Sequence, residues 1–145
     1  MTQRIIPITS ANFIAGRTPD QPLDLPSIFG NNHPLALEIG CGTGHFVLER
    51  ARKQPETNFL AIDIYNKGCF KTCKKIDEAG VQNVRVMRVE ARWLLDKGLQ
   101  PESLSAVYIN CLAQKTPLEQ TIGQPRFSPQ PGSASGTGRR FLFQH

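Results

Sequence analysis

An apolar run, 35–39, is followed by glycines at alternate positions: Gly40, Gly42 and Gly44. The one charged residue in the run is Glu38. Glycine adopts backbone dihedrals that a Cβ forbids, and it lets a ligand lie directly against the backbone. The pattern is typical of a buried parallel strand that turns sharply into a helix and forms a nucleotide-type pocket at the turn.

The acid and the glycine spacing both bear on which ligand fits this turn. A carboxylate at Glu38 can face the ammonium and sulfonium charges of S-adenosyl-L-methionine, whereas it would repel a pyrophosphate. The G-x-G-x-x-G spacing of dinucleotide sites is broken, because His45 stands in the place of the third glycine. The turn therefore favours S-adenosyl-L-methionine over a dinucleotide. The alternative is a glycine-rich turn that binds no ligand.

A second acidic residue, Asp63, ends the next predicted strand, 58–62. An acid at this position can accept hydrogen bonds from both hydroxyls of a nucleotide ribose. Glu38, the glycine turn and Asp63 together predict one half of a cofactor site.

The predicted elements bring these residues to one edge of a sheet. Strands are predicted at 35–39, 58–62, 84–89 and 104–110, and helices at 45–53, 65–79 and 91–97. Three strand–helix units followed by a fourth strand predict an α/β fold with a Rossmann-like, doubly wound parallel sheet. Glu90 and Ala91 follow the third strand at its carboxyl end, where open parallel sheets bind ligands.

Size and charge narrow the class of protein. With 145 residues the chain is long enough for one domain, and its net charge of +5 weakly favours a polyanionic partner. The lysines of the predicted helix at 65–79 form either a solvated face or a phosphate contact. The chain shows neither a secretory segment nor a membrane-spanning run, so we expect a soluble, cytoplasmic protein.

The four cysteines do not follow a zinc-binding spacing, and we expect them to be core thiols. Cys69 and Cys73 lie one helical turn apart, but neither a histidine nor an acid nearby completes a metal site. No metal is therefore expected.

The chain divides into three segments. Residues 1–32 are turn-rich and predict a leader that docks on the core, and 33–111 hold the predicted cofactor-binding core. Residues 112–145 are rich in Gly, Pro and Ser and contain no Asp, which predicts a disordered tail. Three of the five net positive charges lie in this tail, because Lys115, Arg126, Arg139 and Arg140 stand against Glu119. The charge argument for a polyanionic partner is weaker as a result.

Several of these segments resemble one known family, the bacterial tRNA (guanine-N7)-methyltransferases. The resemblance covers about 23–111 and rests on five sequence words in the same order: Ile28-Phe29-Gly30-Asn31, 37–44, 59–65, 79–86 and Val107-Tyr108-Ile109-Asn110. It implies a class I methyltransferase fold, S-adenosyl-L-methionine as cofactor and tRNA as partner.

The resemblance also implies a role for each matching residue. Glu38 and the glycines of the turn would hold the methionine end of the cofactor, Asp63 its ribose, and Glu90 with Ala91 the adenine edge. The family usually carries Glu at the Asp63 position and Asp or Asn at the Glu90 position. Asp63 and Glu90 each change the side-chain length by one methylene, which should shift the ribose and adenine contacts slightly.

The chain departs from the family after Asn110. The family continues with P-D-P-W and a basic P-K-K-R-H run, whereas this chain continues Cys111-Leu112-Ala113-Gln114-Lys115. The family's catalytic aspartate is absent, so no catalytic residue is assigned and the sheet is expected to be incomplete on its C-terminal side. The alternative function is a non-catalytic fragment that binds S-adenosyl-L-methionine or RNA.

A change of reading frame near codon 111 would explain this departure. Codons for 112–120 can be chosen that, read one base later, encode W-P-K-K-R-H-W-S. The same offset converts 136–143 into E-P-D-G-G-F-S-F, which is typical of a turn and a strand. We therefore expect the tail to be the product of a shifted frame; a genuine disordered tail is the alternative.

Overall fold

The structure, a computed structural model, describes residues 5–15, 22–110 and the backbone of 140–144. It contains one parallel sheet with the strand order β1-β4-β3-β2-β5-β6. The strands are β1 (Phe13–Ile14), β2 (Leu35–Ile39), β3 (Asn58–Asp63), β4 (Val84–Arg88), β5 (Leu104–Asn110) and β6 (Arg140–Gln144). The four predicted strands and the doubly wound parallel sheet are confirmed.

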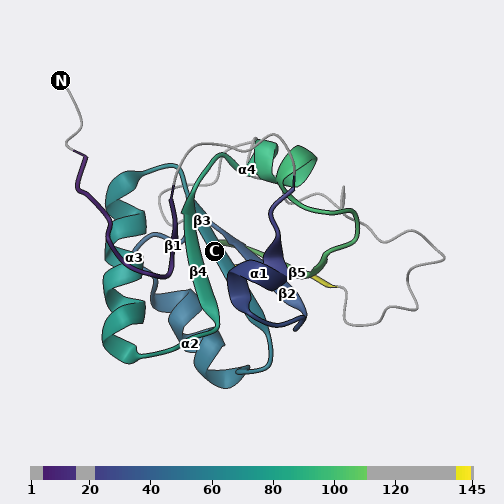
Figure 1. Cartoon of the computed structure of the whole chain (residues 1–145), viewed down its shortest axis with the longest axis horizontal. Helices are drawn as coiled ribbons and strands as arrows, with labels where there is room; N and C mark the ends of the chain where they lie inside the picture. The colour runs from purple at the N-terminus through teal and green to yellow at the C-terminus, as the bar shows by residue number, and fades with distance from the viewer. Residues whose placement is uncertain (1–4, 16–21, 111–139, 145) are drawn as a thin grey trace.

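Helices cover both faces of this sheet (Figure 1). They are α1 (Leu25–Phe29), α2 (His45–Lys53), α3 (Asn66–Ala79) and α4 (Ala91–Trp93), which continues as the π-helical turn η1 (Leu94–Gly98). Helices α2 and α3 pack on one face, and α1 with the α4 and η1 segment packs on the other. The predicted helices at 45–53 and 65–79 are confirmed, and the segment predicted as one helix at 91–97 is divided into α4 and η1.

Alternation along β2 sends side chains into both cores. Leu35, Leu37 and Ile39 belong to the core beneath α1, whereas Ala36 belongs to the core beneath α2 and α3. All five residues of β2 are buried, as expected for a central strand of a parallel sheet. Glu38 is therefore a carboxylate in a strand that has no solvent-exposed face.

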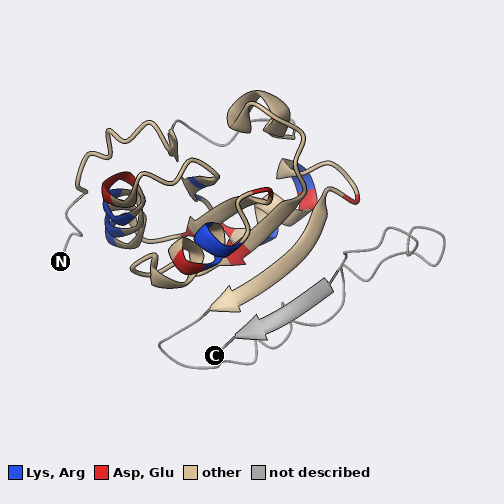
Figure 2. Cartoon of the chain, turned by 90° about the horizontal axis from the view of Figure 1, so that it is seen from below, with Lys and Arg blue, Asp and Glu red and all other residues tan. Residues whose placement is uncertain are grey.

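Helix α3 ends at a glycine cap. Gly80 adopts a left-handed conformation with φ of 73°, and its N–H donates to the carbonyls of Ile76 and Asp77. Cys69, Cys73 and Ile76 are buried on one side of the helix, whereas Lys67, Lys71 and Lys74 are exposed. The blue Lys and Arg positions along α3 are seen in Figure 2. Helix α3 is therefore amphipathic.

The structure contains two strands and one helix that the sequence did not predict. Strand β1 pairs with β4, and α1 places Phe29 in the core, so the leader contributes directly to the folded unit. The backbone of β6 pairs with β5, so the sheet has six strands rather than four. Strand β1 has only two residues, which is too short for a periodic signal.

The prediction of a disordered tail at 112–145 falls outside the described residues, apart from the β6 backbone. In the part of the chain that the structure describes, no helix is long and apolar enough to cross a membrane.

Candidate functional site

The glycine turn lies at the carboxyl edge of the sheet, between the ends of β2 and β3. The N–H groups of Gly40 and Cys41 both donate to the carbonyl of Ile62, at 2.9 and 3.1 Å. Gly40, Gly42 and Gly44 all have positive φ, of 84°, 56° and 88°. These dihedrals explain why the turn needs glycine. Because glycine has no Cβ, no side-chain atom of these residues covers the backbone of the turn.

Glu38 is buried, and only one of its two carboxylate oxygens has a partner. Its side chain is 1% exposed, and its Oε2 accepts a hydrogen bond of 2.8 Å from Nδ2 of Asn110 at the end of β5. Its Oε1 has no hydrogen-bond partner. Burial raises the pKa of Glu38 from 4.5 to about 7; the Asn110 hydrogen bond lowers this pKa and the nearby charge of Asp63 raises it. The buried, unpartnered Oε1 of Glu38 favours a cationic or hydrogen-bond-donating ligand.

Asp63 joins the glycine turn to the start of α3. Its Oδ2 accepts from the N–H of Gly42 at 3.1 Å, and its Oδ1 accepts from the N–H of Tyr65 at 3.1 Å. The side chain is half-buried. Since each carboxylate oxygen has two lone pairs, Asp63 can accept further hydrogen bonds from a ligand.

Helix α3 approaches the turn so closely that two glycines are required. A Cβ on Gly44 would lie 2.9 Å from the Cα of Thr72. A Cβ on Gly68 would lie 2.9 Å from Oδ2 of Asp63 and 3.1 Å from the carbonyl oxygen of Gly42. The hydroxyl of Thr72 donates to that same carbonyl at 3.2 Å. The first turns of α3 therefore position both the glycine turn and Asp63.

Glu90 and Ala91 lie at the same edge, after β4. The N–H of Val89 donates to the carbonyl of Asp63 at 3.1 Å, which joins the ends of β3 and β4. Glu90 is exposed and Ala91 is half-buried. The structure thus brings all seven predicted site residues to the carboxyl ends of β2, β3 and β4.

Sequence reasoning missed three residues that support this edge: Asn110, Thr72 and Gly68. Asn110 was recognised only as part of a strand end, and no local pattern connects it to Glu38. Gly68 carried a signal, because a glycine in the first turn of a helix often marks a close approach.

The cysteines near the turn are buried thiols. Cys41, Cys69 and Cys73 are free and buried, and Sγ of Cys41 lies 3.4 Å from the hydroxyl oxygen of Thr72. Hydrogen bonding to the Cys69 thiol and burial both raise the pKa of Cys41. Across the described ranges, no three His, Cys, Asp or Glu side chains gather as a metal site would require.

Comparison with known proteins assigns this architecture to a family. Residues 32–111 match a family described as putative methyltransferase. The chain belongs to this methyltransferase family. The match extends from the residue after Asn31 to the end of β5, so it includes all seven predicted site residues.

Two relatives and one solved structure extend the comparison. The tRNA (guanine-N(7)-)-methyltransferase of Syntrophotalea carbinolica is 56% identical over 130 residues, which are 88% of this chain and 56% of that protein. The enzyme of the same name from Geobacter metallireducens is 48% identical over 109 residues, or 75% of this chain and 52% of that protein. A putative S-adenosyl-L-methionine-dependent methyltransferase from Methanococcus maripaludis shares the fold, with a TM-score of 0.50 at 14% identity over 68% of this chain and 45% of that chain.

The extent of these matches has two consequences. The chain spans about half the length of the curated relatives it matches. The alignment with the Syntrophotalea carbinolica enzyme covers 88% of the 145 residues of this chain. Residues 1–111 alone are a smaller share of the chain, so this alignment includes part of the segment after Cys111. The reading frame of that segment stays a prediction.

Proposed function

We propose that this member of the methyltransferase family binds S-adenosyl-L-methionine at the glycine turn and acts in methyl transfer to guanine N7 of tRNA. The unpartnered Oε1 of Glu38, buried beside the turn, is the observation that carries the cofactor assignment. The tRNA assignment rests on the two relatives, whose names state that activity. This substrate also favours a cytoplasmic location.

The residues of the carboxyl edge fit the cofactor. Glu38 would face its cationic methionine end, and the positive-φ glycines would let it lie against the backbone. Asp63 would accept from the ribose hydroxyls, and Glu90 with Ala91 would border the adenine. When bound, the cofactor supplies an electrophilic methyl group on a positively charged sulfur.

The protein's contribution to the reaction is mainly positional. Guanine N7 has a lone pair that forms the new N–C bond while the S–C bond breaks, and no proton has to leave the nitrogen for that step. The enzyme therefore needs proximity, orientation and electrostatic support. Glu38 and Asp63 orient the donor in this proposal, and tRNA is the acceptor.

One sequence feature favours a second candidate function. The chain contains no aspartate after Asp96, so the acid that the family resemblance places after Y-I-N is missing. A chain that binds the cofactor without transferring its methyl group would account for this absence. We expect methyl transfer by the chain as given to be weak or undetectable for the same reason.

Calorimetry with S-adenosyl-L-methionine tests the cofactor site. Asp63→Ala and Glu38→Gln should each weaken binding at least tenfold, whereas Glu49→Gln, on the exposed side of α2, should leave it unchanged. Unchanged affinity in both site variants would overturn the assignment.

Incorporation of labelled methyl groups into unmodified tRNA separates the two functions. Any transfer to guanine N7 above the level without protein, however slow, supports the enzyme, and tight cofactor binding without transfer supports the binding fragment.

A further inference from the structure

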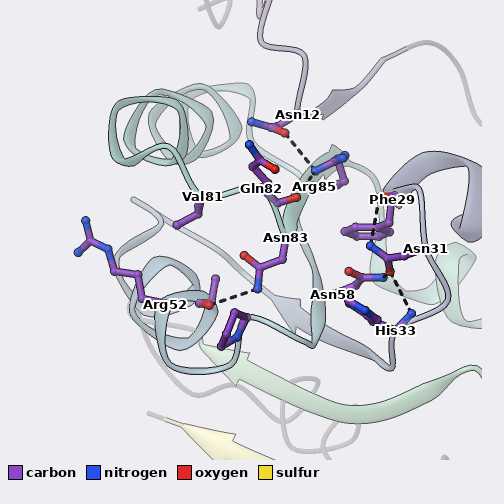
Figure 3. A pocket seen from close by; sticks show the side chains of 12 residues that line it. Asn12, Phe29, Asn31, His33, Arg52, Asn58, Val81, Gln82, Asn83 and Arg85 are labelled. Atoms are coloured by element: carbon purple, nitrogen blue, oxygen red, sulfur yellow. Dashed lines mark hydrogen bonds between the residues drawn. The ribbon is translucent and has the colours of Figure 1, made fainter.

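The amino edge of the sheet, at the other end of the strands from the glycine turn, contains a cavity of about 580 Å³. Figure 3 shows the side chains that line it. Its lining includes Asn12, Phe29, Asn31, Arg52, Asn58 and Arg85. Its size is in the range of small-molecule sites, and side-chain amides are the commonest lining group. None of the cofactor-site residues borders it, so it is a separate feature of the fold.

A chain of hydrogen bonds determines how Asn58 faces this cavity. The backbone N–H of His33 must donate, so the atom of Asn31 that it meets at 3.0 Å is the acceptor Oδ1. That same oxygen lies 2.8 Å from Asn58, which must therefore present its Nδ2 donor. The Oδ1 of Asn58 is left without a partner, although the residue is only 3% exposed. A buried acceptor of this kind requires a donor.

The charge of the cavity is positive. Two arginines line it and none of its lining residues is acidic. The guanidinium of Arg85 lies over the ring of Phe29 at 5.1 Å and donates to Asn12 Oδ1 and to backbone carbonyls. Burial lowers the pKa of Arg85, and no described carboxylate pairs with it. Arg52 is exposed at the rim.

We propose that this cavity binds a nucleotide, either free or as one unit of an RNA strand. An N–H of the base would donate to Oδ1 of Asn58, and the base would lie near the planar Arg85 guanidinium, a group on which bases stack. The phosphate would lie at the rim near Arg52. A nucleotide combines the features that the lining residues favour: a planar body with a donor, and an anionic end. The proposal does not depend on the function of the glycine turn.

Calorimetry on the full chain with 5′-GMP and 5′-AMP tests this site, after saturation with S-adenosylhomocysteine to block the glycine turn. Arg52→Gln should weaken binding of both nucleotides at least fivefold and leave guanosine binding unchanged. Lys53→Gln, at the neighbouring exposed position that does not line the cavity, is the matched control and should bind normally. Asn58→Leu should abolish binding of nucleotides and of guanosine alike.

Each result of these titrations either supports or overturns the nucleotide site. If neither 5′-GMP nor 5′-AMP gives a heat of binding, the proposal is overturned. Binding that is weakened by neither Arg52→Gln nor Asn58→Leu overturns it as well. If Asn58→Leu fails to fold by circular dichroism, the contrast between Arg52→Gln and Lys53→Gln decides. A short single-stranded RNA that competes with 5′-GMP and binds more tightly identifies the strand as the source, whereas tighter 5′-GMP identifies the free nucleotide. Arg52→Gln should bind S-adenosyl-L-methionine with normal affinity, so failure of the cofactor assignment is distinguishable from failure of this one.

Discussion

At the carboxyl edge of the sheet, a glycine backbone meets two carboxylates, whereas at the amino edge side-chain amides meet two guanidinium groups. The carboxyl edge depends on close approach, since α3 lies against Gly44 and Gly68. The amino edge depends on side-chain hydrogen bonds, since the two N–H groups of Asn83 Nδ2 are shared among the carbonyls of Ala51, Gln54 and Thr57. The two edges of one sheet are therefore held by different interactions, and substitutions should affect them by different mechanisms.

The largest effect is expected from Gly44→Ala. The residue has φ of 88°, which disfavours any Cβ, and that Cβ would lie 2.9 Å from the Thr72 Cα. We expect a loss of about 3 kcal/mol in the free energy of unfolding measured with urea. Gly30→Ala is the control at the amino edge, because its φ is 80° but nothing lies within 4 Å, and it should cost about 1 kcal/mol. Equal losses would show that the α3 contact is unimportant.

The next effect depends on pH. The pKa of Glu38 is raised from 4.5 to about 7, so this group contributes stability below pH 4.5 that is lost as the pH rises through about 7. The glutamine of the Glu38→Gln variant cannot ionise. The variant should therefore have a free energy of unfolding about 2 kcal/mol higher at pH 8, where Glu38 is ionised, and no gain at pH 4, where Glu38 is protonated. Urea unfolding at both pH values measures it. Glu49→Gln should show no pH-dependent difference, and a Glu38→Gln gain of equal size at both pH values would contradict the prediction.

Cofactor affinity should also depend on the ionisation of Glu38, but it should rise with pH where stability falls. A cationic ligand favours the ionised form of Glu38. As the pH drops from 8 to 6, the carboxyl of Glu38 in the free protein takes up a proton, so the affinity for S-adenosyl-L-methionine should fall. Calorimetry in buffers of different ionisation enthalpy measures the protons released on binding. The Glu38→Gln variant should release none, and proton release that persists in it would assign the effect to another group.

Asn83→Ala should weaken the amino edge. Its two N–H donors are shared among three carbonyl oxygens that lie 2.9 to 3.2 Å from Nδ2, and the loss of these hydrogen bonds should cost about 2 kcal/mol of stability. Gln82→Ala, at the exposed neighbouring position, should cost less than about 0.5 kcal/mol. Cofactor affinity measured on the folded Asn83→Ala variant should not change, and a clear change would mean that the two edges are coupled.

The smallest effect is expected from Gly68→Ala. The added Cβ would press on Asp63 Oδ2 and on the Gly42 carbonyl, so Asp63 must shift. We expect affinity for S-adenosyl-L-methionine to fall about fivefold, or about 1 kcal/mol, in calorimetry. Glu78→Ala, near the far end of the same helix, should bind normally.

Local sequence patterns were sufficient for most of the fold. The strands at 35–39, 58–63, 84–88 and 104–110 are short apolar runs, and α2 and α3 have helical periodicity. Strand β1 has two residues and α1 has five, so neither is long enough to show a period. Their structure comes from packing on β4 and on the core, which no local pattern encodes.

For the candidate sites, the sequence by itself determined which residues gather at the carboxyl edge, because the end of each parallel strand follows from the strand pattern. Only the tertiary structure decided how those residues are paired. Asn110 donates to Glu38 across 72 positions of sequence, and Asn58 donates to Asn31 across 27. These bonds leave Glu38 Oε1 and Asn58 Oδ1 without partners, and they exist because β2 lies between β3 and β5 in the sheet and 31–33 lies beside the start of β3. Hydrogen bonding between distant residues depends on strand order and register, which local composition does not specify.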